Sequence, residues 1–388
     1  MTDQPMLIDV SRLIWRVWTG RLPTGIDRVC LAYLQRYGEC ARAVVQFKGC
    51  IRVLSQTRSQ PLFRLLEQGS MADHVGFRGK FLRMLPGLLI GSSNKANSPG
   101  ALYLNIGHTG LDAPLLPAWV LRHGLKAVHL IHDLIPITHP EFCRAGEDVR
   151  HARRMAHALE SAAGIIGNSR ATLEELASFA QGQGLRMPPA IDAWISGHPV
   201  PSRVVPSEME RPYFVTVGTI EGRKNHILLL NLWQQMAERM GGRTPLLLII
   251  GQRGWEAELA IAMLDRATGL KGHVRELGRC DDEEMARLIA GARALLMPSF
   301  VEGFGLPVIE ALQLGTPVIA SDLPVFREIA GGIPTLLDPA DGAGWEQAIL
   351  AFSGDCPERV RQIAAMSGYR APDWPSHFAR IDPWLEQL

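Results

Sequence analysis

The chain has 388 residues with a formal net charge of +1, and 47% of its residues are hydrophobic and 20% charged. This length predicts two domains, and the composition is ordinary for a soluble globular protein. A nearly neutral chain has no global field that attracts polyanions, so we expect no nucleic-acid partner.

The six cysteines show neither a C-x-x-C pair nor zinc-ligand spacing, and we interpret them as reduced thiols. The N-terminal "MTDQPMLIDV" has no basic-then-apolar signal pattern, and no run of eighteen apolar residues occurs. We therefore expect a cytoplasmic protein without a transmembrane helix. The cysteines are Cys30, Cys40, Cys50, Cys143, Cys280 and Cys356.

Apolar runs and helical periodicities alternate through the first half of the chain, which indicates a doubly wound α/β domain. Thr172 and Glu175 have capping-box spacing at the last helix of this half, and Ser169 is an alternative cap. The expected strands are 6–11, 101–107, 126–133 and 164–169, and the expected helices are 25–38, 148–163 and 170–180.

The second half repeats the alternation more regularly, and most of its short strands end in glycine or proline. Such alternation predicts right-handed crossovers and a parallel sheet. Asp281 or Asp282 is the expected N-cap of one helix. The expected strands are 213–217, 246–250, 273–278, 294–298 and 317–321, and the expected helices are 226–240, 255–267, 281–292 and 307–315.

A proline-rich connector at 196–212 separates the two halves. We place the domain boundary within it, which gives a first domain of residues 1–203 and a second of residues 204–371. Ligands of open α/β sheets bind outside the carboxyl ends of the strands, so we expect the functional residues at those ends.

Residues 298–322, "PSFVEGFGLPVIEALQLGTPVIASD", join a strand to a helix through a glycine-bearing loop. Pro307 suits the first helical position, and the free N–H groups of such a helix start attract a diphosphate. Glu302 in the loop is able to accept hydrogen bonds from sugar hydroxyls, and Glu310 in the first turn is able to hold a ribose diol. A solvated loop glutamate and a glutamate favoured by the helix dipole remain the alternatives.

The stretch "VTVGTIEGRKNH" ends a strand at Gly218 and brings Arg223 and Lys224 to the next helix start, with Asn225 as its expected N-cap. Two cations at strand ends are what a nucleotide diphosphate needs, above all when it departs with extra charge. The alternative is a pair of exposed surface cations.

Three loops of the first half carry weaker signals. Gly25 in "LPTGIDRV" opens a helix, either as part of a phosphate loop or as a turn glycine, and Arg28 either reaches the acceptor or stays on the helix surface. His132 and Asp133 in "VHLIHDLIP" follow a strand, where a histidine binds a sugar hydroxyl or a phosphate, or holds the loop. The loop of His108 either faces the acceptor or satisfies its own backbone groups.

The motifs E-G-F-G-L-P-x-x-E and G-T-x-E-x-R-K-N resemble those of the family-4 glycosyltransferases, strongly over residues 205–330 and more loosely over the first half. These are retaining enzymes of the GT-B fold, in which two Rossmann-like doubly wound domains face each other across a cleft. The resemblance implies that Glu302 meets the transferred sugar, that Glu310 meets the ribose, and that Arg223 and Lys224 bind the diphosphate.

The resemblance also implies a role for His132 at the donor sugar beside the reacting carbon, and places Gly25 near the donor phosphates, although family members often have two glycines there. The backbone near Leu277 and Gly278 is expected at the nucleobase. The remaining donor-binding residues implied are Gly218, Gly303, Phe304, Gly305 and Leu306.

The predicted function is retaining transfer of a hexose, with mannose favoured, from a GDP- or UDP-sugar to a glycan or polyprenyl-diphosphate-linked acceptor in bacterial exopolysaccharide or lipopolysaccharide synthesis. We expect no cofactor and no metal, because D-x-D is absent and residues 281–284 are typical of a helix start. The alternatives are a sugar-nucleotide 2-epimerase of the same fold and a catalytically silent nucleotide-sugar-binding subunit. No G-x-G-x-x-G follows an early strand, which disfavours a dinucleotide dehydrogenase.

Two segments have less certain surroundings. Residues 77–91 combine aromatic and basic side chains, which suits either contact with an anionic membrane surface, hence a peripheral location, or a core helix with a basic outer face. The tail 372–388 has apolar residues at helical spacing, and the GT-B resemblance implies that it packs back on the first domain.

Overall fold

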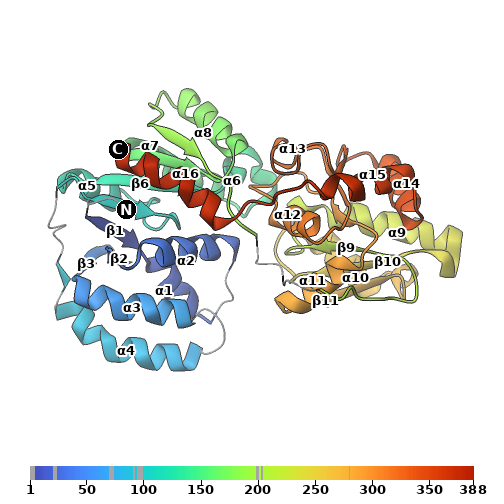
Figure 1. Ribbon diagram of the computed structural model, residues 1–388, viewed down its shortest axis with the longest axis horizontal. Coiled ribbons are helices and arrows are strands. Elements are labelled where there is room, and N and C mark those ends of the chain that lie inside the picture. Colours follow the sequence, from blue (N-terminus) through green and yellow to red (C-terminus); the bar gives the residue numbers. More distant parts are fainter. Residues whose placement is uncertain are drawn as a thin grey trace. The chain divides into compact units, whose positions relative to one another are not determined.

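The computed structural model describes residues 5–20, 24–69, 74–90, 92–93, 99–197, 201, 204–278 and 280–388. The chain forms two compact units. Unit 1 comprises Met1–Leu134, Asp148–Ile195 and Trp374–Leu388, and unit 2 comprises Ile135–Glu147 and Ser196–Asp373. Both are layered α/β structures, which confirms the predicted fold class (Figure 1).

Unit 1 is built on a sheet of eight strands in the order β4-β3-β2-β1-β5-β6-β7-β8. Six strands are parallel, whereas β3 pairs antiparallel with both β2 and β4. The strands are β1 (Met6–Asp9), β2 (Ala41–Phe47), β3 (Cys50–Leu54), β4 (Ser92–Ser93), β5 (Leu102–Asn105), β6 (Lys126–Ile131), β7 (Ala162–Gly167) and β8 (Ala190–Asp192).

The helices of unit 1 include every one predicted there from the sequence. They are α1 (Ser11–Trp18), α2 (Gly25–Tyr37), α3 (Gln56–Gly69), α4 (His74–Ile90), α5 (Leu115–Arg122), α7 (Glu147–Ser161), α8 (Arg170–Gly182) and α16 (Trp374–Gln387). The sequence analysis missed the β2–β3 hairpin. Its two-residue turn is Lys48–Gly49, with φ of 45° and 75°, and positive φ at both positions is the geometry that a tight hairpin turn requires.

Unit 2 is built on a parallel sheet of six strands in the order β11-β10-β9-β12-β13-β14. The strands are β9 (Tyr213–Val217), β10 (Leu246–Ile250), β11 (Val274–Gly278), β12 (Leu295–Met297), β13 (Val318–Ser321) and β14 (Thr335–Leu337). The helices are α6 (Ile135–Thr138), α9 (His226–Met240), α10 (Glu258–Arg266), α11 (Asp282–Ala290), α12 (Leu306–Gln313), α13 (Pro324–Ala330), α14 (Gly342–Ser353) and α15 (Pro357–Met366), with short 3-10 turns η1 (Pro140–Phe142), η2 (Gly222–Lys224), η3 (Gly241–Arg243) and η4 (Thr268–Leu270).

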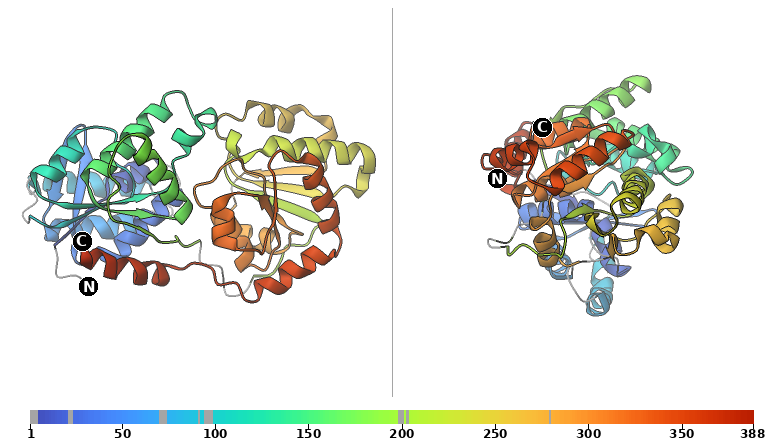
Figure 2. Two further views of the ribbon diagram at one scale, coloured as in Figure 1. Left: turned by 90° about the horizontal axis from the view of Figure 1, so that it is seen from above. Right: turned by 90° about the vertical axis from the view of Figure 1, so that its right-hand side faces the viewer.

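Helices cover both faces of the unit 2 sheet (Figure 2). For this reason β9 and β10 are apolar at nearly every position and are buried along their whole length. One face packs against α9 and α14 around Trp233 and Trp345, which are both fully buried. The indole N–H groups of Trp233 and Trp345 donate to the carbonyls of Pro245 and Asp338 at 2.9 and 3.0 Å, so the two largest core side chains leave no polar atom unsatisfied.

The division into units differs from the predicted boundaries at two places. The chain changes unit at Ile195–Ser196, before the predicted boundary at 203, and residues 135–147 belong to unit 2 although they lie within the predicted first domain. The proline-rich connector contains the first of these points, but no local signal marks the second, because it depends on what the segment packs against.

The caps of three predicted helices are decided by the structure. Ser169, not Thr172, caps α8, because its Oγ accepts the N–H of Thr172 at 3.0 Å. Asn225 precedes α9 in a left-handed conformation, and its side chain donates to the Pro339 carbonyl instead of capping. Asp281 caps α11 as predicted, with its carboxylate accepting the N–H of Glu284 at 2.7 Å.

The aromatic face of α4 is buried. Phe77 and Phe81 are 2% and 8% exposed, their rings stack at 5.6 Å, and Phe81 packs edge-on against Trp18. Membrane contact through these two rings is therefore wrong for this conformation. The basic Lys80 and Arg83 lie on the exposed side, as the alternative of a core helix with a basic outer face predicts.

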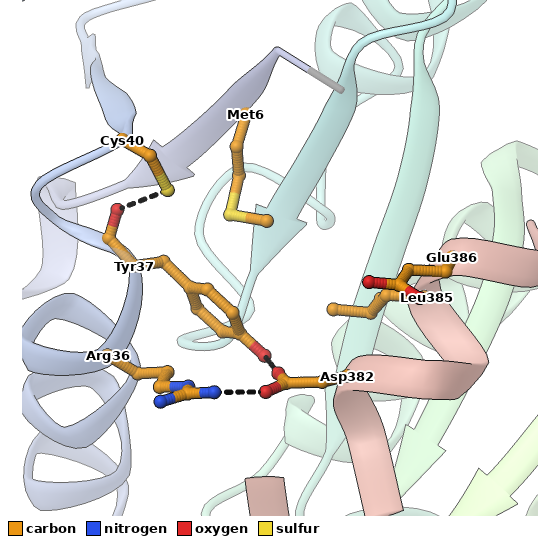
Figure 3. Close-up of a pocket in the computed structure, with 7 residues that line it drawn as sticks. All are labelled: Met6, Arg36, Tyr37, Cys40, Asp382, Leu385 and Glu386. Carbon is orange, nitrogen blue, oxygen red and sulfur yellow. Dashed lines mark hydrogen bonds and ion pairs between the residues drawn. The ribbon is translucent and has the colours of Figure 1, made fainter. Parts of the chain in front are cut away.

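The C-terminal helix α16 is part of unit 1. His377 and Phe378 of α16 pack against Tyr33, and the Tyr33 hydroxyl lies 2.8 Å from His377 Nε2. Figure 3 shows the Tyr37 hydroxyl and the Arg36 guanidinium directed at the Asp382 carboxylate. The helix thus extends the core of unit 1 with residues that are distant in sequence.

Candidate active site

The unit 2 sheet has its topological switch point between β9 and β12, which are adjacent although β10 and β11 separate them in sequence. The loops that follow β9 and β12 leave the sheet at the same carboxyl edge. The first carries Gly218 and Glu221–Lys224, and the second carries Ser299–Gly305. Ligands of doubly wound folds bind at this position, and both sequence motifs converge there.

Glu302 joins the two loops through ion pairs. Its carboxylate lies 2.5 Å from Lys224 Nζ and 2.7 Å from Arg223 Nη1, and it accepts the Ser299 hydroxyl at 2.7 Å. The Glu302 side chain is only 6% exposed. Burial opposes ionisation, but the charges of Lys224 and Arg223 lower the pKa of Glu302 to about 2, so the carboxylate is charged at neutral pH.

Glu221 completes a cluster of two cations and two anions. Arg223 Nη2 lies 2.6 Å from the Glu221 carboxylate, which is 4% exposed. Burial raises the pKa of Glu221 and lowers the pKa of Lys224, because both charged groups have lost water. The sequence analysis did not select Glu221, although it stands two residues before Arg223 within the quoted motif.

Backbone contacts hold the two loops together as well. The N–H of Phe300 donates to the Arg223 carbonyl at 2.8 Å, and Arg223 Nη1 donates to the Val301 carbonyl at 3.2 Å. Gly218 makes room for the cluster, because a Cβ there would lie 3.2 Å from Lys224 Cε and its φ of 139° is unfavourable for other residues. Its role in this structure is to accommodate Lys224.

Helix α12 begins at this edge after Gly305, whose φ is 104°. A Cβ on Gly305 would lie 2.5 Å from the Phe326 ring, so the missing side chain lets the backbone approach the core of unit 2. Phe304 is buried, and Gly303 and Leu306 are half-buried.

Two expectations for α12 need correction. Pro307 is its second residue, because Gly305 in its left-handed conformation makes Leu306 the first. Glu310 is the fifth residue, beyond the first turn, and is 6% exposed, so the helix-dipole alternative does not explain it. The Glu310 side chain lies close to the backbone of Gly197, because a Cβ on Gly197 would lie 3.6 Å from Glu310 Oε1.

His226, the first residue of α9, is a site neighbour that the sequence analysis missed. It is 3% exposed, and among the described side chains both of its ring nitrogens are buried without a hydrogen-bond partner. Burial and the nearby Lys224 charge lower the pKa of His226 to about 4. The imidazole is therefore neutral beside the charged cluster.

Leu277 lies in the edge strand β11, next to Gly278 with φ of 61°. Its side chain is half-buried. The neighbouring Glu276 pairs with Arg253 at 2.8 Å. Both strand residues lie at the carboxyl end of the sheet, but they are not part of the charged cluster.

In unit 1, His108 and His132 follow the adjacent strands β5 and β6, and each bonds to the other's strand. His108 Nε2 lies 2.8 Å from the Leu130 carbonyl of β6, and His132 Nε2 lies 2.8 Å from the carbonyl of Ile106, just after β5. A carbonyl accepts only from N–H, so both rings carry a proton on Nε2. The reciprocal bonds fix both imidazoles at the carboxyl edge of the sheet.

A third histidine extends this pair. His151 of α7 lies with its ring centroid 6.1 Å from that of His108, which in turn is 5.3 Å from that of His132. Burial lowers the pKa of His132 to about 4, and burial together with the neighbouring imidazoles lowers the pKa of His108 well below its ordinary value. Only the fold brings His151 to this place, since it lies 43 and 19 residues along the chain from the other two.

Gly25 is the first residue of α2, and the adjoining charges belong to Asp27. The buried Asp27 carboxylate accepts the N–H of Thr24 and lies 2.7 Å from the Nε atoms of Arg12 and Arg16. This is a capping contact at the third helical position, which the sequence analysis missed. Arg28 is half-buried on the same helix.

Within the described part of the chain, no group of three or more His, Cys, Asp or Glu side chains is arranged to hold a metal ion. Of the helices in the described ranges, none combines the length and the apolar character needed to cross a bilayer.

Two Rossmann-like units, with paired cations and a helix start at the carboxyl edge of the second sheet, are the architecture expected of the GT-B glycosyltransferases. Known proteins agree. The family Glycosyl transferases group 1 matches residues 202–362, which include the whole charged cluster.

The sequence is similar to two mannosyltransferases of Escherichia coli. It is 32% identical over 261 residues to O-antigen chain mannosyltransferase B, covering 65% of this chain and 67% of that protein. It is 30% identical over 244 residues to serotype-specific mannosyltransferase WbdA, covering 57% of this chain but only 30% of that longer protein. The chain belongs to the group 1 glycosyltransferase family.

The solved structure of Anabaena Alr3699/HepE in complex with UDP and glucose superposes with a TM-score of 0.67 at 16% identity. The match covers 99% of this chain and 100% of that one. At this identity the similarity establishes the fold, and it extends over both units.

Proposed function

We propose that this protein transfers a hexose, with mannose favoured, from a nucleotide sugar to a glycan or polyprenyl-diphosphate-linked acceptor in bacterial exopolysaccharide or lipopolysaccharide synthesis. The observation that carries the proposal is the buried cluster of Arg223, Lys224 and Glu302 at the switch point of the unit 2 sheet. Both E. coli relatives are mannosyltransferases, which supports the choice of sugar. The Anabaena structure contains UDP, so both GDP and UDP stay candidates for the nucleotide.

In this proposal Arg223 and Lys224 bind the donor diphosphate together with the N–H groups at the start of α12. Charge on the departing diphosphate grows in the transition state, so fixed cations stabilise that state more than the ground state. Glu302 stays ionised and accepts hydrogen bonds from hydroxyl groups of the transferred sugar. Glu310 binds the ribose, and the backbone at Leu277 contacts the base. No metal ion is required in this scheme.

His132 is proposed to meet the donor sugar. Its Nε2–H is committed to the Ile106 carbonyl, so its Nδ1 is the atom that accepts a hydrogen bond from a sugar hydroxyl. The role of His108 as an acceptor residue, like those of Gly25 and Arg28, is part of the same proposal.

The proposed reaction retains the anomeric configuration. The bond from the sugar's anomeric carbon to the diphosphate oxygen breaks, and the acceptor oxygen bonds to that carbon on the same face through an oxocarbenium-like transition state. The acceptor's hydroxyl proton passes to the departing phosphate oxygen, which acts as the base. No covalent enzyme intermediate is needed.

The test is a thermal-shift screen of GDP, UDP and their hexose conjugates, followed by transfer assays with the stabilising donor. Binding to the folded protein raises its melting temperature with occupancy, so the correct nucleotide shifts it most. We expect an α-linked product by NMR and full activity in EDTA. A β-linked product contradicts the stereochemistry, and loss of activity in EDTA contradicts the metal-free scheme.

A lipid-linked acceptor also suggests a peripheral location on the inner membrane face. Because Phe77 and Phe81 are buried, such contact uses the basic outer side of α4, including Lys80 and Arg83. The double variant K80E/R83E should then lose sedimentation with anionic liposomes, while neutral liposomes bind neither protein. Equal sedimentation of both proteins with anionic liposomes would exclude this surface.

A further inference from the structure

Residues 135–147 leave the first half of the chain and fold onto unit 2 as α6 and η1. Phe142, at the end of η1, stacks on Phe300 with ring centroids 5.2 Å apart and ring planes only 8° apart. On its other side, His139 is nearly parallel to Phe142 at 6.3 Å and 17°. Three rings thus stack over a loop of the charged cluster.

The inner ring, Phe300, belongs to that loop. It lies between Ser299, which donates to Glu302, and Glu302 itself. Its backbone N–H donates to the carbonyl of Arg223 at 2.8 Å, so Phe300 is one of the residues that bond the loop after β12 to the loop after β9. A ring fixed on Phe300 therefore restrains both loops.

Phe142 also lies beside the second loop, next to Gly222. A Cβ on Gly222, the residue before Arg223, would lie 3.5 Å from Phe142 Cδ1 and 2.6 Å from the Glu256 carbonyl. The segment has a further anchor two residues on, where the Arg144 guanidinium lies 5.5 Å from the centre of the Trp255 ring. Phe142 is therefore held on one side by Phe300 and on another by the Gly222 turn.

We infer that Phe142 is a positioning residue for glycosyl transfer: its stack on Phe300 fixes the two loops that carry Arg223, Lys224 and Glu302. This inference rests on the proposed function for its catalytic consequence, but not for its structural one. Phe142 itself bonds to none of the charged groups in the described contacts, so it acts only through the loop geometry. A cluster fixed before the donor arrives avoids an ordering cost on binding.

The Phe142 stack also fixes the chain that follows His132. His132 and Phe142 are joined by only nine intervening residues, and the chain passes from unit 1 to unit 2 at Leu134–Ile135. The segment that follows the proposed sugar-contacting histidine is therefore fixed to the loops that carry the diphosphate-binding cations.

The test compares F142A, which removes the ring, with F142Y, which keeps it, and F352L as a control. Phe352 lies in the core of unit 2 and is 2% exposed, so F352L reports loss of general stability without a change in the stack. For each protein we measure the melting temperature, the kcat and the donor KM, and hydrogen–deuterium exchange of residues 218–225 and 298–305.

We expect F142A to exchange at least tenfold faster at the Phe300 amide, and its kcat/KM to fall about tenfold. F142Y should keep the Phe300 exchange rate and kcat/KM at their wild-type values. F352L should lower the melting temperature and leave the exchange of the two loops unchanged. Unchanged loop exchange in F142A overturns the inference, and so does loop exchange in F352L that rises as much as in F142A. If the wild type transfers no sugar, the proposed function fails while the exchange data still decide the role of Phe142. Should F142A not fold, F142L, which keeps bulk but not a planar ring, replaces it.

Discussion

At the residue scale, the Glu302 carboxylate meets two cations and a hydroxyl although its side chain is almost fully buried. E302Q keeps the shape and removes the charge. Breaking a buried ion pair leaves an uncompensated charge and costs about 3–5 kcal/mol, and here the E302Q change leaves two cations, Lys224 and Arg223, beside the Glu221 carboxylate. We expect the free energy of unfolding, measured with urea, to fall by about 3–5 kcal/mol. We also expect the rate of sugar transfer to fall about a hundredfold. E238Q, an exposed change on α9, is the control, and equal rates for E302Q and wild type would exclude a catalytic role for the carboxylate.

The same carboxylate predicts how stability depends on acid. The pKa of Glu302 in the folded protein is about 2, below its ordinary value of 4.5. A depressed carboxyl pKa stabilises the folded state above the unfolded pKa, and this stabilisation is lost as the pH falls from about 4.5 towards 2. The stability difference between wild type and E302Q should therefore be full at pH 6 and reduced by about half at pH 3. A difference that is equal at both pH values would contradict the ion-pair account.

Glu175 on α8 predicts the opposite dependence. Burial and the nearby Asp133 raise the pKa of Glu175 to about 7. A carboxyl whose folded pKa is raised destabilises the folded state once the unfolded group ionises, from about pH 4.5 upward, and the penalty is complete above pH 7. E175Q should therefore raise the melting temperature at pH 8 and leave it unchanged at pH 4. E174Q, on the exposed side of the same helix, should change neither.

At the element scale, helix α12 is bounded by glycines in left-handed conformations, Gly305 before it and Gly315 after it. A Cβ at Gly305 meets the Phe326 ring at 2.5 Å, whereas a Cβ at Gly315 meets nothing within 4 Å. G315A should therefore cost about 1 kcal/mol for backbone strain alone, and G305A roughly 1–3 kcal/mol more because the core must also shift. Urea unfolding measures the loss in the free energy of unfolding for each variant. Equal losses would show that the contact with Phe326 does not contribute to the cost of G305A.

The two variants should also separate in activity. Gly305 sets the start of α12, where the diphosphate is proposed to bind, and Gly315 lies beyond the helix end. We therefore expect lower donor affinity in G305A and unchanged affinity in G315A. This comparison uses the same substitution at both ends of one helix.

Most elements were predictable because their signals are local. The apolar runs of β9 and β10 and the helical period of α9 agree with the structure within a few residues. The β2–β3 hairpin was missed because Lys48–Gly49 is a weaker turn signal than Asn-Gly. The cap of α8 stayed open in the sequence because Ser169 and Thr172 offer equivalent hydroxyls, and only the backbone position of Ser169 decides between them.

At the scale of the whole molecule, α16 completes the core of unit 1 from the far end of the chain. The Tyr37 hydroxyl donates to Asp382 at 2.6 Å, and Tyr33, which is fully buried, packs against His377 and Phe378 (Figure 3). D382A should cost about 1–2 kcal/mol, since it leaves the Tyr37 hydroxyl without this acceptor. Thermal unfolding measures the loss, and A379S, at an exposed position of the same helix, should be neutral.

Removal of residues 374–388 is the stronger version of this change. It exposes Tyr33 and Tyr37 together, so we expect unit 1 to lose its cooperative unfolding transition. An unaltered transition in the truncated chain would show that α16 is dispensable for the core.

The sequence by itself determined the fold class, the group 1 family and the two motifs of unit 2. These features depend on local periodicity and on short spacings, such as the eight positions from Glu302 to Glu310. Such signals lie within one segment of the chain and are visible without the fold. It also selected His108 and His132, because both follow predicted strands.

Only the tertiary structure decided which groups meet. The ion pairs of Glu302 join positions 78 and 79 residues apart, His151 joins His108 and His132, and residues 135–147 fold onto unit 2 with Phe142 on Phe300. The physical reason is that burial and charge pairing act between side chains in space. Their partners come from packed strands and helices, and no interval along the chain encodes them.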